Sequence, residues 1–557
     1  MEERIACSLG EGSPAVVEFE SSQALTGAGV LFLLPALLVQ GLLKTNQVYE
    51  WAKSSYYSLD SIVITIAFMA LLRIKNPEQL KQCKPGEIGR IIGLDRIPEV
   101  KCLRSKLDFL TGQQQATHLN NILVDHWYRD DPSRDAGFLY VDGHVRIYYG
   151  DKANLPLKHV SRQKLCLSAT TEYWVNDVQG MPVLMVMGEL TEKLQDAIKN
   201  QIIPQLQKTK LLPEPIPEDD TPVCTLIFDR EAYSPAFFKW LWETYRIAVI
   251  TYRKNVKDTW QVEGFKHTAV SVLQQRILMH LCEQEIVLDG SRFREIRRLS
   301  EDGHQTSIVT THPTLETASI AGRMFGRWSQ ENFFRYLIQD YDFDKMVSYG
   351  IESVDPDKEI VNPEYRTLTY RLKKLREKIQ RLEALFYPLL QLAIDRPIDE
   401  LPAITKKQNE NRELIGRYRK HEQELLALRS QTPNRLKVCQ MPEQKRYNKL
   451  KTESKLLMNV IKMICYRAES SVAQLIAPYL ARSGDEKRMI VKQIIQSSAD
   501  LEPDYENNTL TVTLHSLSTH RFNLAAEELT QVLNQTGTIF PGTNLTMIFK
   551  SPALSDC

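Results

Sequence analysis

The chain has 557 residues, of which 43% are apolar and 25% are charged, and its net charge is +1. This length exceeds what one hydrophobic core supports, so we expect two to four domains. The composition is typical of a globular protein. The near-zero net charge excludes a protein that coats nucleic acid through its overall charge, so any such contact must come from local basic patches.

Two features bear on the compartment. The nine cysteines are scattered and never form a CxxC pair, which indicates a reducing compartment and argues against a zinc site. The N-terminus lacks the sequence of basic, apolar and small residues that a signal peptide shows.

The uncharged run from Gly27 to Leu43 approaches the lower length limit of a membrane span, but it contains Pro35 and Gln40. We therefore favour a buried helical core there, and a membrane span is the alternative.

The N-terminal part is predicted to be helical. Residues 1–20 lack periodicity and are expected to be loosely held, and residues 21–130 form an all-helical domain. Within it, residues 84–107 resemble a short helix, a glycine-containing turn and a basic second helix. A helix-turn-helix of this kind would place Lys101 and Arg104 near DNA. Two ordinary amphipathic helices joined by a turn would show the same pattern.

Two apolar segments each end in an aspartate. Asp142 follows Gly137-Phe-Leu-Tyr-Val, and Asp229 follows Val223-Cys-Thr-Leu-Ile-Phe. Both segments have the length and composition of buried strands, which present an acidic side chain at or near a strand end. After Asp142 the strand continues, and alternation places Asp142, His144 and Arg146 on one face.

A third acidic residue lies in a segment predicted to be one helix from Thr317 to Lys345. Side chains four residues apart share a helix face, which here lines up Arg323, Arg327, Glu331 and Arg335. One carboxylate flanked by guanidinium groups can hold a metal ion and phosphate together; the alternative is a solvated face with ion pairs. In the same helix, Trp328 either stacks on a nucleotide or packs against a neighbouring helix.

These residues resemble the DDE transposases of bacterial insertion sequences, in the branch whose ribonuclease-H-like domain carries a β-rich insertion before the Glu. Asp142, Asp229 and Glu331 match the three acidic positions in order. The signature of that branch is Tyr, two residues, Arg, three residues, Glu, six residues, Lys. Arg327 and Glu331 fit it, whereas Met324 stands in the Tyr position and Ile338 in the Lys position.

The resemblance implies a DNA transposase that cuts at element ends and joins them to target DNA. Asp142, Asp229 and Glu331 would hold two Mg²⁺ ions, with Mn²⁺ able to substitute. Arg327 and Arg335 would clamp phosphate. Arg323, His144 and Arg146 are further predicted DNA or phosphate contacts. The implied partners are double-stranded DNA, both terminal repeats and target, and further copies of the chain as a dimer or higher oligomer, without a membrane. The implied location is the bacterial cytoplasm, at the nucleoid.

Three alternatives remain open at this point. The first is a domesticated or inactive relative that grips DNA without cutting it, which the departures at Met324 and Ile338 favour. The second is a related nuclease that never performs strand transfer. The third is a helical interaction protein or membrane-associated protein in which the acidic residues are incidental.

The expected fold class is an α/β catalytic domain with a ribonuclease-H-like mixed sheet, joined to helical parts and a small C-terminal α/β unit. The catalytic domain covers residues 135–256 and 312–350, and residues 257–311 form the β-rich insertion. Its arginines 292, 294, 297 and 298 fit either a DNA-facing flap or a charged edge strand.

The C-terminal half begins with heptad repeats. Leucines and other apolar residues recur in residues 362–435 at steps of three and four, in two arms that predict an antiparallel helical hairpin, with pairing between chains as the alternative. The second seam is predicted to contain Leu414, Tyr418, His421, Leu425 and Leu428. A long helix over 440–482 follows, whose Lys445 to Lys455 region either contacts DNA or is solvated. Residues 488–557 form the C-terminal α/β unit.

Overall fold

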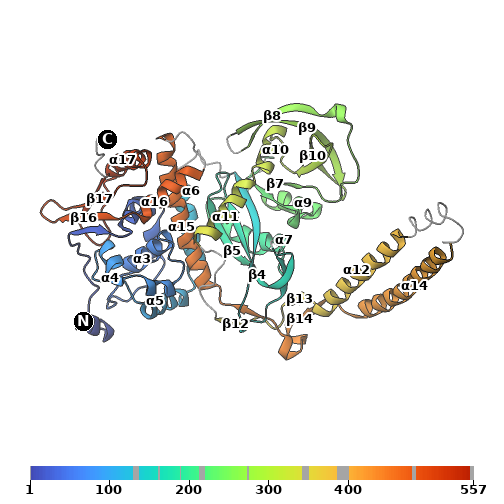
Figure 1. The fold of residues 1–557 in the computed structure, drawn as a ribbon, viewed down its shortest axis with the longest axis horizontal. Coiled ribbons are helices and arrows are strands. Elements are labelled where there is room, and N and C mark those ends of the chain that lie inside the picture. The colour runs from blue at the N-terminus through green and yellow to red at the C-terminus, as the bar shows by residue number, and fades with distance from the viewer. Residues whose placement is uncertain are drawn as a thin grey trace.

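A computed structural model describes residues 2–128, 137–160, 163–188, 190–212, 220–272, 275–341, 350–385, 401–479 and 485–551. For residues 328–331 the description covers the helical backbone and not the side chains. Three parts follow one another along the long axis of the molecule (Figure 1). They are a largely helical body that contains both chain ends, a part built on a large sheet, and a protruding arm of two helices.

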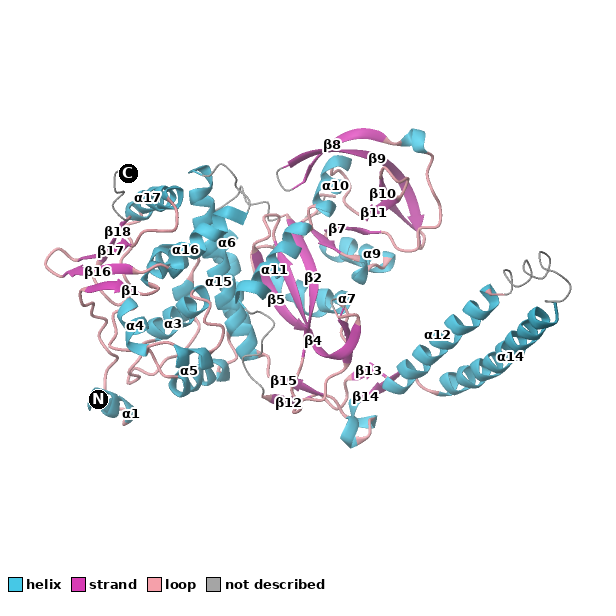
Figure 2. Ribbon diagram, in the orientation of Figure 1, coloured by secondary structure: helices cyan, strands magenta, loops and turns pink. Residues whose placement is uncertain are grey.

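The central part is a ten-stranded mixed sheet (Figure 2). Its first strands are β2 (Phe138–Ile147), β3 (Leu157–Val160), β4 (Leu165–Asn176), β5 (Pro182–Gly188), β6 (Cys224–Phe228) and β7 (Ile247–Tyr252). Strand β2 pairs antiparallel with β4 and parallel with β6, and β6 pairs parallel with β7. All residues of β6 are buried, because parallel strands are covered on both faces.

The predicted β-rich insertion continues this same sheet. Its strands are β8 (Lys266–Val272), β9 (Gln275–Leu288), β10 (Ser291–Leu299) and β11 (Gln305–Thr310), and β11 joins the sheet by pairing with β7. Asp289 and Gly290 connect β9 to β10 with φ values of 48° and 77°. Two successive positive φ angles suit the tight hairpin turns that Asp-Gly favours. The insertion is thus an extension of the central sheet.

Helices cover both faces of the sheet. On one face lie α7 (Leu194–Ala197), α8 (Ile203–Gln207) and α9 (Pro235–Tyr245), packed in one core with Val141, Leu226 and Val249. On the other face lie α10 (Thr317–Phe325) and α11 (Trp328–Tyr341). The rings of Trp174 and Phe333 are 5.5 Å apart between β4 and α11.

The single helix predicted from Thr317 to Lys345 is wrong in its continuity. Helix α10 ends at Phe325, Gly326 and Arg327 form a turn, and α11 begins at Trp328. The Gly326 amide donates to the carbonyl of Gly322, 2.8 Å away, as the last bond of α10. Helix α10 therefore has Gly326 as its C-cap, and glycine is among the residues that disfavour continuation of a helix. The four charged residues at i, i+4 spacing do not share one straight helix face.

The helical body joins the two ends of the chain. It contains α3 (Leu59–Leu71), α4 (Pro85–Ile91), α5 (Val100–Gly112), α6 (Ala116–Tyr128), α15 (Glu453–Ile476), α16 (Asp485–Gln496) and α17 (His520–Gln535). Its sheet has the order β1-β16-β17-β18, with β1 (Ser22–Leu25), β16 (Ala499–Asp504), β17 (Thr509–Leu514) and β18 (Thr546–Lys550). One apolar core extends from Phe19 to Phe549. The predicted separate N-terminal and C-terminal units are therefore one body.

Several local predictions change in this body. The described residues 2–20, expected to be loosely held, contact the body: Arg4 pairs with Asp95 at 2.7 Å, and Phe19 is 2% exposed. The apolar run from residue 27 forms the short helices η1 (Ala28–Leu33) and α2 (Leu34–Val39) inside the core. In the part of the chain that is described, none of the helices has both the length and the apolar character that crossing a membrane requires.

The long helix predicted over 440–482 starts later than expected. Helix α15 begins at Glu453, and the preceding residues include the short strand β15 (Asn448–Leu450). Lys455 is only 3% exposed, so it neither contacts DNA nor lies in solvent. Helix α15 is buried along most of its length because it passes through the centre of the body.

The predicted helical hairpin is present as α12 (Pro363–Ala384) and α14 (Leu401–Gln431). Ion pairs join Arg376 to Glu422 and Glu383 to Arg419, so the two helices run in opposite directions. In α12 the predicted seam residues Leu368, Leu372, Leu375, Ile379 and Leu382 pack together, and the predicted Phe386 lies outside the described residues. In α14 the seam uses Ile415, Tyr418 and Leu425, whereas the predicted His421 and Leu428 are exposed.

Candidate active site

Asp142 and Asp229 lie at neighbouring positions on two paired parallel strands. Val141 of β2 pairs with Phe228 of β6, and each aspartate directly follows one of these two residues. One Asp142 carboxylate oxygen accepts a hydrogen bond from the Gly143 amide at 3.0 Å, and one Asp229 oxygen accepts from the Arg230 amide at 2.7 Å. The pairing register therefore brings both carboxylates to the level where β6 ends.

The electrostatic environment of Asp142 is unusual. The pKa of Asp142 is raised to about 6: burial raises it most, the Arg327 guanidinium and the Gly143 amide lower it, and the carboxylates of Asp229 and Glu231 raise it. The Glu231 carboxylate lies close to strand β2 beside Asp142. If Gly143 carried a β-carbon, that atom would be 3.6 Å from an oxygen of Glu231. The carboxylates of Asp229 and Glu231 therefore repel the ionised form of Asp142.

Arg327 connects the turn between α10 and α11 to this acidic pair. Its guanidinium lies 3.9 Å from Asp229 and is 12% exposed. His144, two residues after Asp142, stacks on Phe334 of α11 with ring centroids 5.5 Å apart. The turn and the start of α11 are thus held against the strand that carries Asp142.

Glu331 and Trp328 lie in the first turn of α11, and their side chains are outside the described residues. Glu331 occupies the helix position three residues before Phe334, which contacts His144. Among the described side chains, no three His, Cys, Asp or Glu groups converge in a way that could hold a metal ion. The oxygen pair Asp142 and Asp229 suits Mg²⁺, which takes few protein ligands.

Three further arginines were predicted to contact DNA, and the structure places them differently. Arg146 is 3% exposed, and its guanidinium lies 3.2 Å from the buried carboxylate of Glu172, so the prediction that it contacts phosphate does not fit its burial. Arg323 lies with its guanidinium over the ring of Phe138. Arg335 is exposed on α11.

The predicted helix-turn-helix residues lie on α5, which follows α4 after an eight-residue connection. Lys101 is exposed, whereas the Arg104 guanidinium pairs with Glu78. DNA contact by these two residues stays a prediction.

Met324 and Ile338, the two residues that depart from the transposase signature, lie in apolar surroundings. Met324 is fully buried in the core under α10, and Ile338 packs against the core of the helical body.

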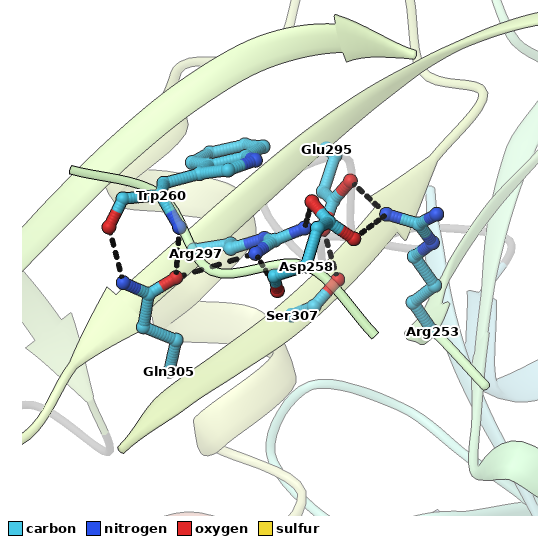
Figure 3. A network of polar contacts seen from close by, with 7 residues as sticks. All are labelled: Arg253, Asp258, Trp260, Glu295, Arg297, Gln305 and Ser307. Atoms are coloured by element: carbon cyan, nitrogen blue, oxygen red, sulfur yellow. Dashed lines mark hydrogen bonds and ion pairs between the residues drawn. The ribbon is translucent and has the colours of Figure 1, made fainter. Parts of the chain in front are cut away.

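Arginines of the insertion serve an internal network (Figure 3). Arg297 is fully buried and pairs with Glu295 at 2.7 Å and with Asp258 at 2.6 Å, and Arg253 pairs with Glu295 at 2.6 Å. Arg294 pairs with Glu283. The charges of Arg294 and Arg297 are therefore used inside the protein, which argues against the DNA-facing flap.

A cleft of about 480 Å³ opens beside Gly143 and contains charged residues that the sequence did not single out. Burial lowers the pKa of Lys158 to about 8, and burial raises the pKa of Glu192 to about 7. Glu231 also lines this cleft. Its position two residues after Asp229 is a signal that sequence reasoning had available. Lys158 gives no such signal, because only tertiary folding brings it here.

The sheet and its acidic pair define an α/β protein with a candidate enzyme site at the end of β6. Comparison with protein families then identifies the class: residues 1–552 match the family model Transposase_29, described as "Transposase protein". The chain belongs to this transposase family. The comparison with curated proteins gives no match.

Proposed function

We propose that this transposase acts through a DDE triad of Asp142, Asp229 and Glu331, cleaving DNA at element ends and joining them to target DNA. The observation that carries the proposal is the register of β2 with β6, which places Asp142 and Asp229 side by side. Further support comes from the strand order β5-β4-β2-β6-β7, three antiparallel strands followed by two parallel ones, which agrees with a ribonuclease-H-like domain.

The proposed cofactor is Mg²⁺, held by Asp142, Asp229 and Glu331. When bound, two such ions activate the attacking oxygen and stabilise the leaving oxygen of an in-line displacement. The mutual repulsion of the carboxylates around Asp142 supports this assignment, since a divalent cation relieves it. Arg327 adds a guanidinium beside Asp229 that is suited to hold the scissile phosphate.

The proposed partner is double-stranded DNA, both element end and target. Bringing two ends together requires more than one catalytic site, so we also propose that the chain acts as a dimer or larger assembly on DNA. Measurement of the mass of the protein–DNA complex by light scattering tests this; a complex with one chain per duplex would contradict it.

Cleavage of a labelled duplex that contains the DNA flanking the gene tests the triad. We expect Mg²⁺-dependent nicking by the native chain and a loss of at least about 10³-fold, roughly 4 kcal/mol, in Asp142→Asn, Asp229→Asn and Glu331→Gln. Asp151→Asn, an exposed aspartate in the loop after β2, is the matched control and should retain activity.

Two results would contradict the triad. Cleavage that persists in Asp142→Asn and Glu331→Gln would assign catalysis to other residues. Absence of cleavage by the native chain, with DNA binding retained, would identify a DNA-binding relative without catalysis.

A further inference from the structure

The two-helix arm concentrates positive charge. Helix α12 has seven Lys and Arg residues against three Glu, and α14 has seven against four. The whole chain has a net charge of only +1, so the rest of the molecule is net acidic. The arm protrudes from the sheet-based part (Figure 1), which keeps its charges away from that acidic remainder.

The positive charges of α12 gather on the face opposite its apolar seam. Arg366, Lys373, Lys374 and Arg381 are exposed at positions i, i+7, i+8 and i+15, which share one helix face. Lys374 pairs with Glu377 on the same helix. Arg366, Lys373 and Arg381 form no ion pair with another described residue, so their charges are available to an external anion.

The base of this face lies at the cleft beside Gly143, the residue that follows Asp142. Arg366 lines the cleft that opens at Gly143, together with Lys158. The charge of Lys158 interacts with both Arg366 and Glu231, and Glu231 in turn interacts with Asp142. A continuous line of interacting charges therefore runs from the acidic pair, through the cleft, to the arm.

We propose that Lys158, Arg366, Lys373, Lys374 and Arg381 form a basic track that binds the phosphate backbone of duplex DNA next to the scissile bond. Helix α12 has 22 residues and is therefore about 33 Å long, close to one turn of a DNA duplex. This inference rests on the proposed function, because it places the cleaved DNA at the candidate active site.

The chemistry of the face favours DNA over a protein partner. Protein interfaces need buried aromatic or aliphatic anchors at their centre. On the described outer face of α12, Tyr370 is the one large apolar side chain exposed, at 61%. The outer face of α12 instead carries several basic side chains and one exposed aromatic ring. Such a surface can neutralise DNA phosphates without contacting the bases.

The test measures how DNA affinity depends on salt. The full chain carrying Asp142→Asn, which prevents cleavage during the measurement, is titrated onto a labelled duplex at several salt concentrations. The track variant adds Arg366→Gln, Lys373→Gln, Lys374→Gln and Arg381→Gln. The matched control adds Lys406→Gln, Arg412→Gln, Arg417→Gln and Lys420→Gln, four exposed basic residues of α14 in the same arm.

The track variant should lower the slope of log affinity against log salt by about 2 to 4, because each neutralised phosphate contributes about 0.9. It should also bind at least about tenfold more weakly at moderate salt, whereas the control should change the slope by less than about 1. An equal loss in both variants would overturn the track in favour of a general positive field, and an unchanged slope would overturn it outright.

Failure of the proposed function gives a different result. If the native chain does not cleave but the track variant still lowers the slope, the track stands as a DNA-binding surface and the triad fails. If the chain with intact arm binds no DNA at all, both proposals are overturned.

Discussion

Asp142 illustrates how the burial of a carboxyl group lowers the stability of the folded state. Its carboxyl group is partly buried and faces two other carboxylates, and its pKa is raised from about 4 to about 6. In the unfolded chain the group has its ordinary pKa, so the folded state carries an energetic penalty wherever Asp142 is ionised. The penalty is full above pH 6 and disappears as the group becomes protonated in both states below about pH 4.

We therefore expect Asp142→Asn to be more stable than the native chain at pH 8 while being inactive. A shift of two pKa units corresponds to about 3 kcal/mol, and the partial exposure of Asp142 reduces the expected gain to about 1 to 2 kcal/mol. The gain should shrink as the pH falls from 6 to 4. Thermal denaturation of both proteins across this pH range measures it.

The control for this experiment is Asp151→Asn, because Asp151 is exposed in the loop after β2. A destabilised Asp142→Asn at pH 8 would mean that the carboxylate makes favourable interactions in the fold that outweigh its burial.

At the scale of elements, the helical hairpin shows which residues of a heptad pattern become buried between the two helices. The sequence contains apolar or aromatic residues at both the predicted and the observed seam positions of α14. Packing against α12 selects Ile415, Tyr418 and Leu425, because these side chains share one apolar core with the buried side chains of α12. His421 stays outside and lies 3.3 Å from Glu424 of its own helix.

We expect Ile415→Asp to open the hairpin and His421→Asp to be tolerated. Ile415 is 8% exposed, so the substitution loses about 2 to 5 kcal/mol of packing and buries an unpaired charge. Limited proteolysis of the arm measures the effect, since opened helices are cleaved faster. Equal protection of the two variants would mean that the observed seam does not hold the hairpin together.

The break between α10 and α11 shows that hydrophobic periodicity does not predict where one helix ends and the next begins. The spacing of four residues between Arg323, Arg327, Glu331 and Arg335 predicted that they share one helix face. Gly326 ends the first helix, and the turn directs Arg327 toward Asp229 while Arg323 covers Phe138. Spacing alone cannot reveal such a turn, because the apolar pattern on both sides of it remains helical.

At the scale of the whole molecule, the two chain ends depend on each other. Strand β1 pairs with β16, and the rings of Phe32 and Phe549 meet edge to face with centroids 4.9 Å apart. Residues more than 500 positions apart thus share one core, so the N-terminal and C-terminal segments are expected to fold as one cooperative unit.

A double-mutant cycle with Phe32→Leu and Phe549→Leu tests this coupling. We expect each single variant to be destabilised, and the double variant to lose less than the sum by about 0.5 to 1.5 kcal/mol, the range for aromatic pairs. Chemical denaturation of the helical body measures it. Strict additivity would indicate that the two ends are stabilised independently.

The sequence by itself determined the local features of this protein. The two apolar segments that lead into Asp142 and Asp229, the β-rich insertion and the helical hairpin follow from periodicity and composition, which depend on neighbouring residues. Only tertiary structure decided what distant residues do together. It merged both chain ends into one core, buried Arg146 with Glu172, and brought Lys158 and Arg366 to the cleft beside Gly143. The physical reason is that burial, charge pairing and strand register depend on contacts between residues far apart in the chain, and one sequence carries no direct signal of them.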